Sequence, residues 1–595
     1  MDKSNTKTNK HIAQLFRSIA AVYLIKNEIR FKILAYQNAA DIIEKMTEEV
    51  YDLWKQDKLD KIPGIGLNLA KYLDEYFRKG KSTHFENILN QVPASIFEFM
   101  KIPGIGPKKA YKLAQILNIK EEKNAINKLK KAAESRKIEK LSDFGIKSQE
   151  SIIESIKIFE KKKYFDNRMP LPYAYRYAQI IVDYLKRNTC VQRIDLLGSL
   201  RRMTETIGDI DISVKTSKRN MKQLIDYFIK YPKKISIDNA GQEKASIITF
   251  PNIRVDLRLQ EGKQYGSMLQ YLTGSKTHNI KLREFGLKKR YSLSEYSIKD
   301  LKNRKNYYFE KEEDFYNFLG LQYIPAELRE GTNEIELAEK HKLPNLIELK
   351  DIKGDMHIHS NYDLKPSHDL GKNSYVEIYK KALQKNYSYI GFTDHNPKIT
   401  GLSEKEIIEI LNKRKKYIDI SMQKVKSRKL DYFTGLEVDI LINGELAIPK
   451  KALSLVDFLV IGIHSAFNMN KTDMTKRILN GLDHEKAKIL AHPTGRKFAV
   501  REGYDLNWNE IFKYCKEKNV AIEINSWPER LDLSYDKVKE GINNKNKFII
   551  NTDSHDVSHM DLMTYGVSVA RKGFATKNDI INAYNLNDFI KWIRG

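Results

Sequence analysis

Short apolar segments followed directly by histidine or acidic residues recur through the C-terminal third of the chain. The apolar segments have the length and composition of strands, and Lys/Glu-rich stretches typical of helices separate them. Alternation of this kind predicts a parallel sheet, either an α/β barrel or an open sheet. The predicted strands are Tyr389–Phe392, Phe458–Ile461, Ile489–Leu490, Val520–Ile524 and Phe548–Ile550.

The polar residues that end these segments are of the types that bind transition metals. The 13 histidines are unevenly placed, and many fall in short motifs with Asp or Glu. Histidine with carboxylates suits Mn²⁺, Fe²⁺ or Zn²⁺ rather than Mg²⁺ alone. One histidine after a strand is usually structural, but a series at converging strand ends predicts a metal site. The motifs are Asp355–Ser360, Thr393–His395, Gly435–Glu437, Gly462–Ser465, Ala491–Pro493 and Thr552–His555.

The sequence Ile-Pro-Gly-Ile-Gly occurs at residues 62–66 and again at residues 102–106. Residues 11–90 show the apolar spacing of helices, and each copy precedes a basic segment of helical composition. A glycine turn between helices exposes backbone N–H groups that can bind phosphate. This helix-hairpin-helix pattern contacts the DNA backbone without reading sequence. One copy could be an ordinary turn, but two copies predict DNA binding through Gly64, Gly66, Gly104, Gly106, Lys108 and Lys109.

The chain carries a large excess of positive charge. Its 104 Lys and Arg residues outnumber 77 Asp and Glu residues, giving a net charge of +27. This excess favours a polyanionic partner such as nucleic acid. The alternative is that the chain comes from an organism whose proteins are generally rich in lysine. Two cysteines, Cys190 and Cys515, exclude a disulfide framework and fit a reducing compartment. The apolar stretch Ile12–Ile25 is interrupted by Arg17 and is too short to span a bilayer. We therefore expect a cytoplasmic protein with no membrane partner.

A set of carboxylates in the middle of the chain has the spacing of a two-metal site. Leu197–Arg202 contains Gly-Ser and two arginines, and Gly208–Asp211 follows it. Asp209 and Asp211 share a face if they lie in a strand, and Asp256 lies in a second strand-like segment. Three carboxylates on adjacent strands could hold two Mg²⁺ ions for an in-line phosphoryl transfer. A bare Asp-x-Asp is weak evidence, but this order of motifs predicts a nucleotidyltransferase palm.

With Tyr271–Ser275, Asn279 and Arg283, the chain resembles a family X DNA polymerase. The resemblance implies that Asp209 and Asp211 bind both metals and that Asp256 helps to deprotonate the primer 3′-hydroxyl. It also implies nucleotide-binding roles: phosphate contacts for Ser199, Arg202 and Gly208, sugar contacts for Tyr271 and Gly274, and base-pair contacts for Asn279 and Arg283. Leu272 replaces the usual phenylalanine of this segment.

The first hairpin region differs from that of family members with 5′-deoxyribose-phosphate lyase activity. Tyr72 occupies the place of the lysine that forms the Schiff base, and Asn68 that of an assisting lysine. Tyrosine cannot form an imine, and the neighbouring Lys71 would point about 100° away on a helix. We therefore expect weak or absent lyase activity. The resemblance also implies K⁺ or Na⁺ at the two hairpin turns, bound by backbone carbonyls near Ile62, Ile65, Ile102 and Ile105.

The C-terminal motifs resemble those of the PHP (polymerase and histidinol phosphatase) domain, a distorted (β/α)₇ barrel with up to three metal ions. Three residues, Asp363, His368 and Asp369, could supply the ninth ligand, and we slightly favour Asp369. The resemblance to polymerase-linked PHP domains implies Mn²⁺-dependent 3′–5′ exonuclease activity. Abasic-site endonuclease and 3′-phosphatase activities are also found among members of this family. Arg496 and Arg530 could contact phosphate or form surface salt bridges. The other implied ligands are His357, His359, His395, Glu437, His464, His492, Asp553 and His555.

These features predict a multidomain protein of α+β and α/β class. Its parts are helical helix-hairpin-helix domains, a nucleotidyltransferase palm with a mixed sheet, and a C-terminal PHP barrel. The expected boundaries are a helical domain at 1–85, a second hairpin subdomain at 86–165, the palm at 166–260, a nucleotide-selection subdomain at 261–330, a linker at 331–352 and the PHP domain at 353–595.

The predicted function is DNA polymerisation into short gaps during repair, with a PHP exonuclease that trims 3′ ends. The expected partners are gapped or nicked DNA and dNTPs, and we expect a monomer. The alternatives are a phosphatase of small phosphoesters with a non-catalytic DNA-binding half, and a non-catalytic protein that bridges DNA ends. The intact carboxylates and metal-binding motifs argue against both.

Overall fold

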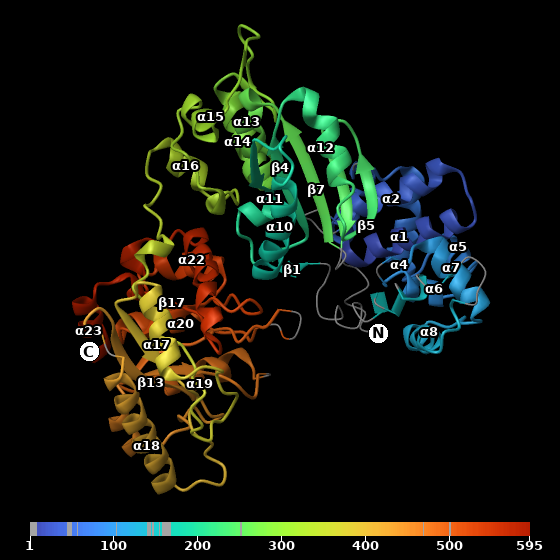
Figure 1. Ribbon diagram of the computed structural model, residues 1–595. Coiled ribbons are helices and arrows are strands. Elements are labelled where there is room, and N and C mark those ends of the chain that lie inside the picture. Colours follow the sequence, from blue (N-terminus) through green and yellow to red (C-terminus); the bar gives the residue numbers. More distant parts are fainter. Residues whose placement is uncertain are drawn as a thin grey trace. The chain divides into compact units, whose positions relative to one another are not determined.

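The computed structural model forms two compact units, residues 1–164 and 165–595 (Figure 1). It describes residues 9–44, 50–55, 57–62, 64–102, 104–139, 144–145, 148–150, 152–153, 155–156, 168–249, 253–425, 427–467, 469–498, 501 and 503–595. The expected palm boundary at 165/166 falls outside these residues. Within the described ranges, no helix combines the length and the apolar character needed to cross a bilayer.

The first unit is helical where it is described. Its helices pack because apolar residues recur at helical spacing, as in α4, where Leu69, Leu73 and Phe77 are all buried. The two glycine hairpins join η2 to α4 and α6 to α7. The elements are α1 (Asn9–Ile25), α2 (Arg30–Glu44), α3 (Val50–Lys55), η2 (Leu59–Lys61), α4 (Leu67–Lys79), α5 (Thr83–Leu89), α6 (Ser95–Phe99), α7 (Pro107–Ile116) and α8 (Ala125–Glu134).

The second unit begins with a five-stranded mixed sheet in the order β2-β4-β7-β6-β5. Apolar residues of β4, β6 and β7 pack in one core with helices α10 and α12, because alternate residues of a strand face the same side. The strand-like segments that contain Asp209, Asp211 and Asp256 are strands β4 and β7. The elements are β1 (Met169–Pro170), α10 (Leu171–Lys186), β2 (Arg193–Leu196), α11 (Gly198–Arg201), β3 (Thr206–Ile207), β4 (Asp209–Lys215), α12 (Met221–Phe228), β5 (Lys234–Ala240), β6 (Lys244–Thr249) and β7 (Ile253–Gln260).

A small subdomain follows the sheet and continues through the segment that the sequence predicts as a linker. Helix α16 (Glu334–Glu339) lies within residues 331–352, and its Ile335 and Ala338 are buried in the core of this subdomain. One helix of the expected linker therefore packs against this subdomain. The other elements are α13 (Tyr265–Thr273), α14 (Lys276–Lys288), β8 (Tyr291–Leu293), β9 (Ile298–Asp300), β10 (Asn306–Tyr307) and α15 (Glu312–Phe318).

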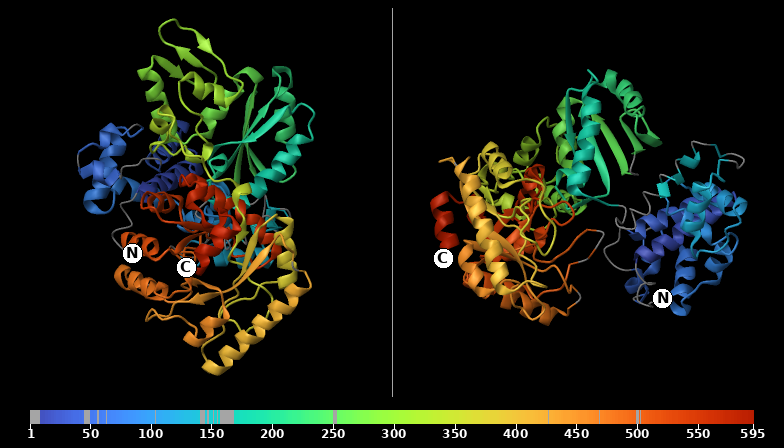
Figure 2. Two further views of the ribbon diagram at one scale, coloured as in Figure 1. Left: turned by 90° about the vertical axis from the view of Figure 1, so that its left-hand side faces the viewer. Right: turned by 60° about the horizontal axis from the view of Figure 1, so that its bottom comes forward.

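The C-terminal part is a parallel sheet whose seven strands follow one another in sequence order. A bridge between Ile358 and Ser554 brings the two edge strands together, so the sheet is a nearly closed barrel, with its helices outside (Figure 2). The predicted α/β barrel is thus confirmed. The strands are β11 (Gly354–Asp355), β12 (Tyr389–Phe392), β13 (Asp431–Asp439), β14 (Phe458–Gly462), β15 (Ala487–Leu490), β16 (Ala521–Asn525) and β17 (Phe548–Asn551). The helices are α17 (Tyr375–Gln384), α18 (Glu404–Gln423), α19 (Lys471–Leu482), α20 (Trp508–Glu517), α21 (Tyr535–Asn543), α22 (Met563–Lys572) and α23 (Leu586–Arg594).

Candidate active sites

Three carboxylates lie together on the five-stranded sheet. Strands β4 and β7 run parallel, and Asp211 is directly opposite Asp256. Asp209 lies two residues before Asp211 on the same face of β4, and one oxygen from each of the three carboxylates lies within 4.8 Å of the others. The intervening Ile210 is buried in the core with α10 and α12. The acids therefore project from the opposite face of the sheet.

The electrostatics of this cluster favour a cation. Burial, followed by the charges of Asp209 and Asp256, raises the pKa of Asp211 to about 7. Arg254 donates from Nε to both oxygens of Asp256 at 3.0 Å, and Ser246 also hydrogen bonds to this carboxylate. Asp256 is therefore held in one orientation, as metal-ligating carboxylates commonly are. Like charges this close are stabilised by divalent cations, so the residues fit a Mg²⁺ site.

The turn at α11 lies directly beside Asp211. Gly198 has a φ of +57°, and a Cβ there would lie 2.0 Å from Oδ2 of Asp211, so a larger residue cannot fit. The buried Ser199 Oγ has no hydrogen-bond partner among the described residues. Arg202 donates to the carbonyl of Thr273 at 2.5 Å. The free hydroxyl and the adjacent guanidinium suit a bound phosphate.

The predicted nucleotide-selection residues are brought together at the end of α13 and on α14. Asn279 Nδ2 donates to the backbone oxygen of Tyr271 at 2.7 Å, and Gln270 donates to Asn279 Oδ1 at 2.9 Å. The Arg283 guanidinium lies 5.1 Å from the centre of the Tyr271 ring. Gly274 follows α13 with a φ of +67°. Gly208 directly precedes β4 and lies close to the guanidinium of Arg168.

A second cluster fills the carboxyl ends of the barrel strands, with the fully buried Glu437 at its centre. Its oxygens lie 2.8 Å from His492 Nε2 and 3.1 Å from Nε2 of both His357 and His464. His395 Nδ1 is also 3.1 Å from Glu437, and Asp553 lies 3.3 Å from His359 Nε2. The structure thus brings together residues that are almost 200 positions apart in the sequence.

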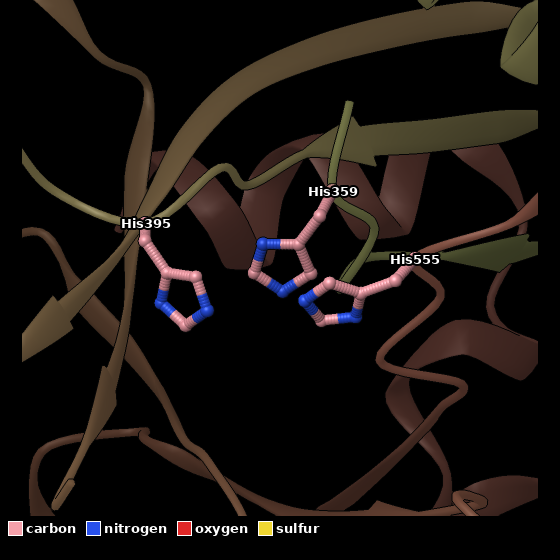
Figure 3. Close-up of side chains that lie close together, drawn as sticks. All are labelled: His359, His395 and His555. Atoms are coloured by element: carbon pink, nitrogen blue, oxygen red, sulfur yellow. The ribbon is translucent and has the colours of Figure 1, made fainter. Parts of the chain in front are cut away.

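His359, His395 and His555 form a third group beside this centre (Figure 3). The exposed carboxylate of Asp369 lies 3.7 Å from His395 Nε2 and 3.6 Å from His555 Nε2. His368 instead lies 3.1 Å from Asp439, and Asp363 accepts a hydrogen bond from the backbone of Lys365. The His368 ring also lies 4.9 Å from that of His395, and His368, Asp439 and His464 form another group that could hold a metal. Of the three candidates for the ninth ligand, Asp369 and His368 are therefore both near the histidines.

Several buried polar atoms of the barrel cluster lack a hydrogen bond of good geometry, which is costly for buried groups unless they bind an ion. Within the described residues, no hydrogen-bond partner is found for His357 Nε2, either nitrogen of His359, His395 Nδ1, Glu437 Oε2 or His555 Nε2. Neutral imidazole and carboxylate donors together fit Mn²⁺, Fe²⁺ or Zn²⁺.

Two carboxylates behind the histidines were not among the residues predicted from sequence. Glu523 accepts from His357 Nδ1 at 2.8 Å and from the backbone N–H of His492 at 2.7 Å, and Asp439 contacts His464 Nδ1. Burial alone would raise the pKa of Glu523, but the charge of His357 lowers it. Such carboxylates orient metal-ligating imidazoles. A sequence signal exists for Asp439, which lies two residues after Glu437 on the same strand.

The two arginines near the barrel cluster have different surroundings. Arg496 forms an ion pair with Glu205 at 3.0 Å. Of the two roles considered for Arg496, phosphate contact or a salt bridge, the structure therefore has the salt bridge. Arg530 lies 3.8 Å from Asp553 and is 18% exposed, so its guanidinium is at the metal-binding cluster.

The glycine hairpins of the first unit have the turn geometry that their sequence requires. Gly64 and Gly104 have φ values of +81° and +77°, and Gly66 and Gly106 are the exposed N-terminal caps of α4 and α7. Lys108 is exposed and donates to Asn27 Oδ1 at 3.1 Å. Lys109 is half-buried, and burial lowers its pKa.

Tyr72, in α4, is stacked on His84 at 3.9 Å between ring centres. Its ring is therefore packed within the helical unit.

Four family models match the chain. They are a helix-hairpin-helix domain (residues 7–82), a helix-hairpin-helix motif (88–116), the DNA polymerase beta thumb (268–330) and the PHP domain (355–527). Two relatives, each named a probable phosphatase, are 27% identical over parts of this chain. The protein from Clostridium novyi aligns over 30% of this chain and 71% of its own length. The one from Vibrio parahaemolyticus aligns over 25% of this chain and 56% of its own length.

A protein of Bacillus subtilis named DNA polymerase/3′-5′ exonuclease PolX is 32% identical over 584 residues. This alignment covers 97% of the present chain and 98% of the relative, so it spans both carboxylate clusters. The chain therefore belongs to the PolX family of DNA polymerases, the family X type that carries a C-terminal PHP domain.

Proposed function

We propose that this chain is a DNA polymerase that fills short gaps during repair and that its PHP domain is a separate 3′–5′ exonuclease. The main support is the register of β4 and β7, which places Asp211 beside Asp256 with Asp209 on the same face. The similarity to the Bacillus subtilis polymerase and exonuclease over nearly the whole chain agrees with this assignment.

In the polymerase site, Asp209, Asp211 and Asp256 would hold two Mg²⁺ ions, which would supply charge stabilisation for the attacking and leaving oxygens. Asp256 accepts, or helps to remove, the proton of the primer 3′-hydroxyl. Ser199 and Arg202 bind the triphosphate of the incoming dNTP, and Gly208 allows its close approach. Tyr271 and Gly274 line the sugar, while Asn279 and Arg283 face the nascent base pair.

In the PHP site, up to three Mn²⁺, Fe²⁺ or Zn²⁺ ions would supply Lewis-acid activation for hydrolysis of a phosphodiester. Asp369 is the ninth ligand, because it lies beside His395 and His555. Arg530 contacts the scissile phosphate, whereas Arg496 is engaged with Glu205. Abasic-site cleavage and 3′-phosphate removal would use the same centre. The other ligands are His357, His359, His395, Glu437, His464, His492, Asp553 and His555.

In the helical unit, Gly64, Gly66, Gly104 and Gly106 allow backbone N–H groups to reach DNA phosphates, and Lys108 and Lys109 add charge. K⁺ or Na⁺ at these turns would neutralise phosphate as well. The substrate is gapped or nicked DNA, and affinity falls steeply with salt. We further propose that the protein acts as a monomer in the cytoplasm and that its lyase activity is weak or absent, because Tyr72 cannot form an imine.

A second candidate function is hydrolysis of small phosphoesters by the PHP domain, with a non-catalytic DNA-binding half. Two relatives named probable phosphatases match part of the chain, which favours this candidate. The intact carboxylate triad argues against it, because a pure DNA-binding half has no use for three clustered acids.

One gel separates these functions. A 5′-labelled primer beside a one-nucleotide gap with a downstream 5′-phosphate is incubated in Mn²⁺, with and without dNTPs. We expect Asp209→Ala to lose extension only and His357→Ala to lose shortening only. If the wild type neither extends nor shortens the primer but releases phosphate from a small ester, the phosphatase candidate replaces the polymerase proposal.

A further inference from the structure

The turn that carries Arg202 lies against the PHP domain, within the second unit. Glu205 accepts hydrogen bonds from Arg496 at 3.0 Å and from the backbone N–H of Tyr535 at 3.4 Å. On the other side, Lys572 Nζ lies 3.4 Å from the backbone oxygen of Arg202. Residues on two helices and one loop of the barrel therefore hold a turn of the polymerase sheet.

Lys572 also reaches the side chain that holds Arg202. Glu330 accepts from Arg202 Nε at 3.2 Å and forms an ion pair with Lys572 through the same oxygen, Oε1. The Lys572 side chain is only 1% exposed. A lysine this buried needs a counter-charge, and Glu330 provides it.

Lys572 changes the net charge of the group that it forms with Arg202 and Glu330. Arg202 with Glu330 is neutral, whereas the addition of Lys572 gives the group a net charge of +1. This positive net charge matters because the group lies beside the proposed nucleotide site. Arg202 Nη1 donates to the carbonyl of Thr273, next to Gly274 and the proposed sugar-binding segment. Without Lys572, the neutral Arg202–Glu330 pair would have no net attraction for a triphosphate.

We propose that the PHP domain contributes Lys572 to the polymerase as a positioning residue for dNTP binding. Lys572 neutralises Glu330, so Arg202 keeps its orientation and its attraction for the triphosphate. The inference rests on the proposed role of Arg202. It means that the barrel supports the polymerase site as well as containing the nuclease site.

The test measures dNTP affinity and the maximal rate separately, in single-turnover filling of a one-nucleotide gap by the full chain. The primer carries 3′-terminal phosphorothioate linkages that block trimming. We expect Lys572→Met to weaken dNTP binding about 10- to 20-fold, the effect of one unit charge across roughly 10 Å at an effective dielectric constant near 20. The maximal rate should change by less than about 3-fold, and Lys572→Arg, which keeps the charge, should retain more of the affinity than Lys572→Met.

A double variant distinguishes charge from structural support. If Lys572 acts by neutralising Glu330, Lys572→Met combined with Glu330→Gln restores the net charge of +1 and should recover the wild-type affinity. A purely structural contact predicts no recovery, which would overturn the proposal. Arg571→Met is the matched control, because Arg571 pairs with Glu327 at 2.7 Å across the same contact without touching Arg202. It should leave dNTP affinity unchanged.

Two further results keep this inference distinct from the proposed function. Exonuclease activity on unprotected single strands, measured on the same preparations, checks that the PHP domain of each variant is folded. If Arg202→Gln weakens dNTP binding but Lys572→Met does not, the inference fails while the role of Arg202 stands. If Arg202→Gln itself has no effect, the proposed role of Arg202 fails and the inference fails with it.

Discussion

Replacing Glu312 by glutamine tests whether a buried charge network supports the polymerase site. Glu312 is 2% exposed, and it binds Arg329, which is fully buried, and Arg201. Arg201 Nη2 lies 2.6 Å from Glu312 Oε2, while Arg201 Nη1 donates to Thr273 Oγ1. The network thus connects α15 with α11 and with the residue before Gly274.

The magnitude follows from the pKa of Glu312. Burial alone would raise this pKa, but the two guanidinium groups overcome burial and lower it to about 2. The difference from the ordinary value of 4.5 corresponds to about 3 kcal/mol of unfolding free energy. Loss of one partner from a buried ion pair typically costs about 3–5 kcal/mol, in agreement. We expect Glu312→Gln to lower the thermal midpoint by about 5–10 °C.

The pH dependence gives the refuting result. Because the folded pKa is depressed, the ionised Glu312 stabilises the fold above about pH 4.5, and this contribution disappears as pH falls toward about 2. Differential scanning calorimetry of wild type and variant should therefore show midpoints that converge over this range. Glu310→Gln is the control, since Glu310 is exposed and pairs with Lys215, and it should not shift the midpoint measurably. Equal midpoints for wild type and Glu312→Gln at pH 7 would refute the reasoning.

Four other outcomes follow from the site and the hairpins. Asp439→Asn should weaken Mn²⁺ activation of the exonuclease about 10- to 100-fold, because it removes the negative charge that orients His464; excess Mn²⁺ should restore the rate, and an unchanged Mn²⁺ titration would exclude this role. Asp369→Asn should lower the number of Mn²⁺ ions bound per chain, measured by metal analysis after dialysis, while Asp363→Asn should not. Lys108→Ala should reduce the slope of log affinity for gapped DNA against log salt by about one, measured by fluorescence anisotropy; no change would mean that Lys108 touches no phosphate. Borohydride reduction with 5′-deoxyribose-phosphate DNA should trap no adduct with the wild type, since Tyr72 cannot form an imine, and a trapped adduct on the first unit would contradict this.

Features that depend on a few neighbouring residues were accessible from the sequence. The strands Tyr389–Phe392 and Phe548–Ile550 were predicted within one residue of their observed ends, because continuous apolar runs with polar ends are typical of buried parallel strands. Strand β13 was missed, because Asp431, Thr434 and Gly435 interrupt the apolar pattern. The packed helix α16 was expected to be linker, because charge and proline dominate its surroundings.

The sequence alone determined the chemistry available to this protein, since residue types and short spacings place Asp209 beside Asp211 and histidines at strand ends. Only the tertiary structure decided which distant groups support them. The parallel register of β4 and β7 aligns Asp256, barrel closure sets Glu523 behind His357, and the contact between α22 and the polymerase turn joins Lys572 to Glu330. Such partners are selected by strand register and by packing between elements, which local sequence patterns do not encode.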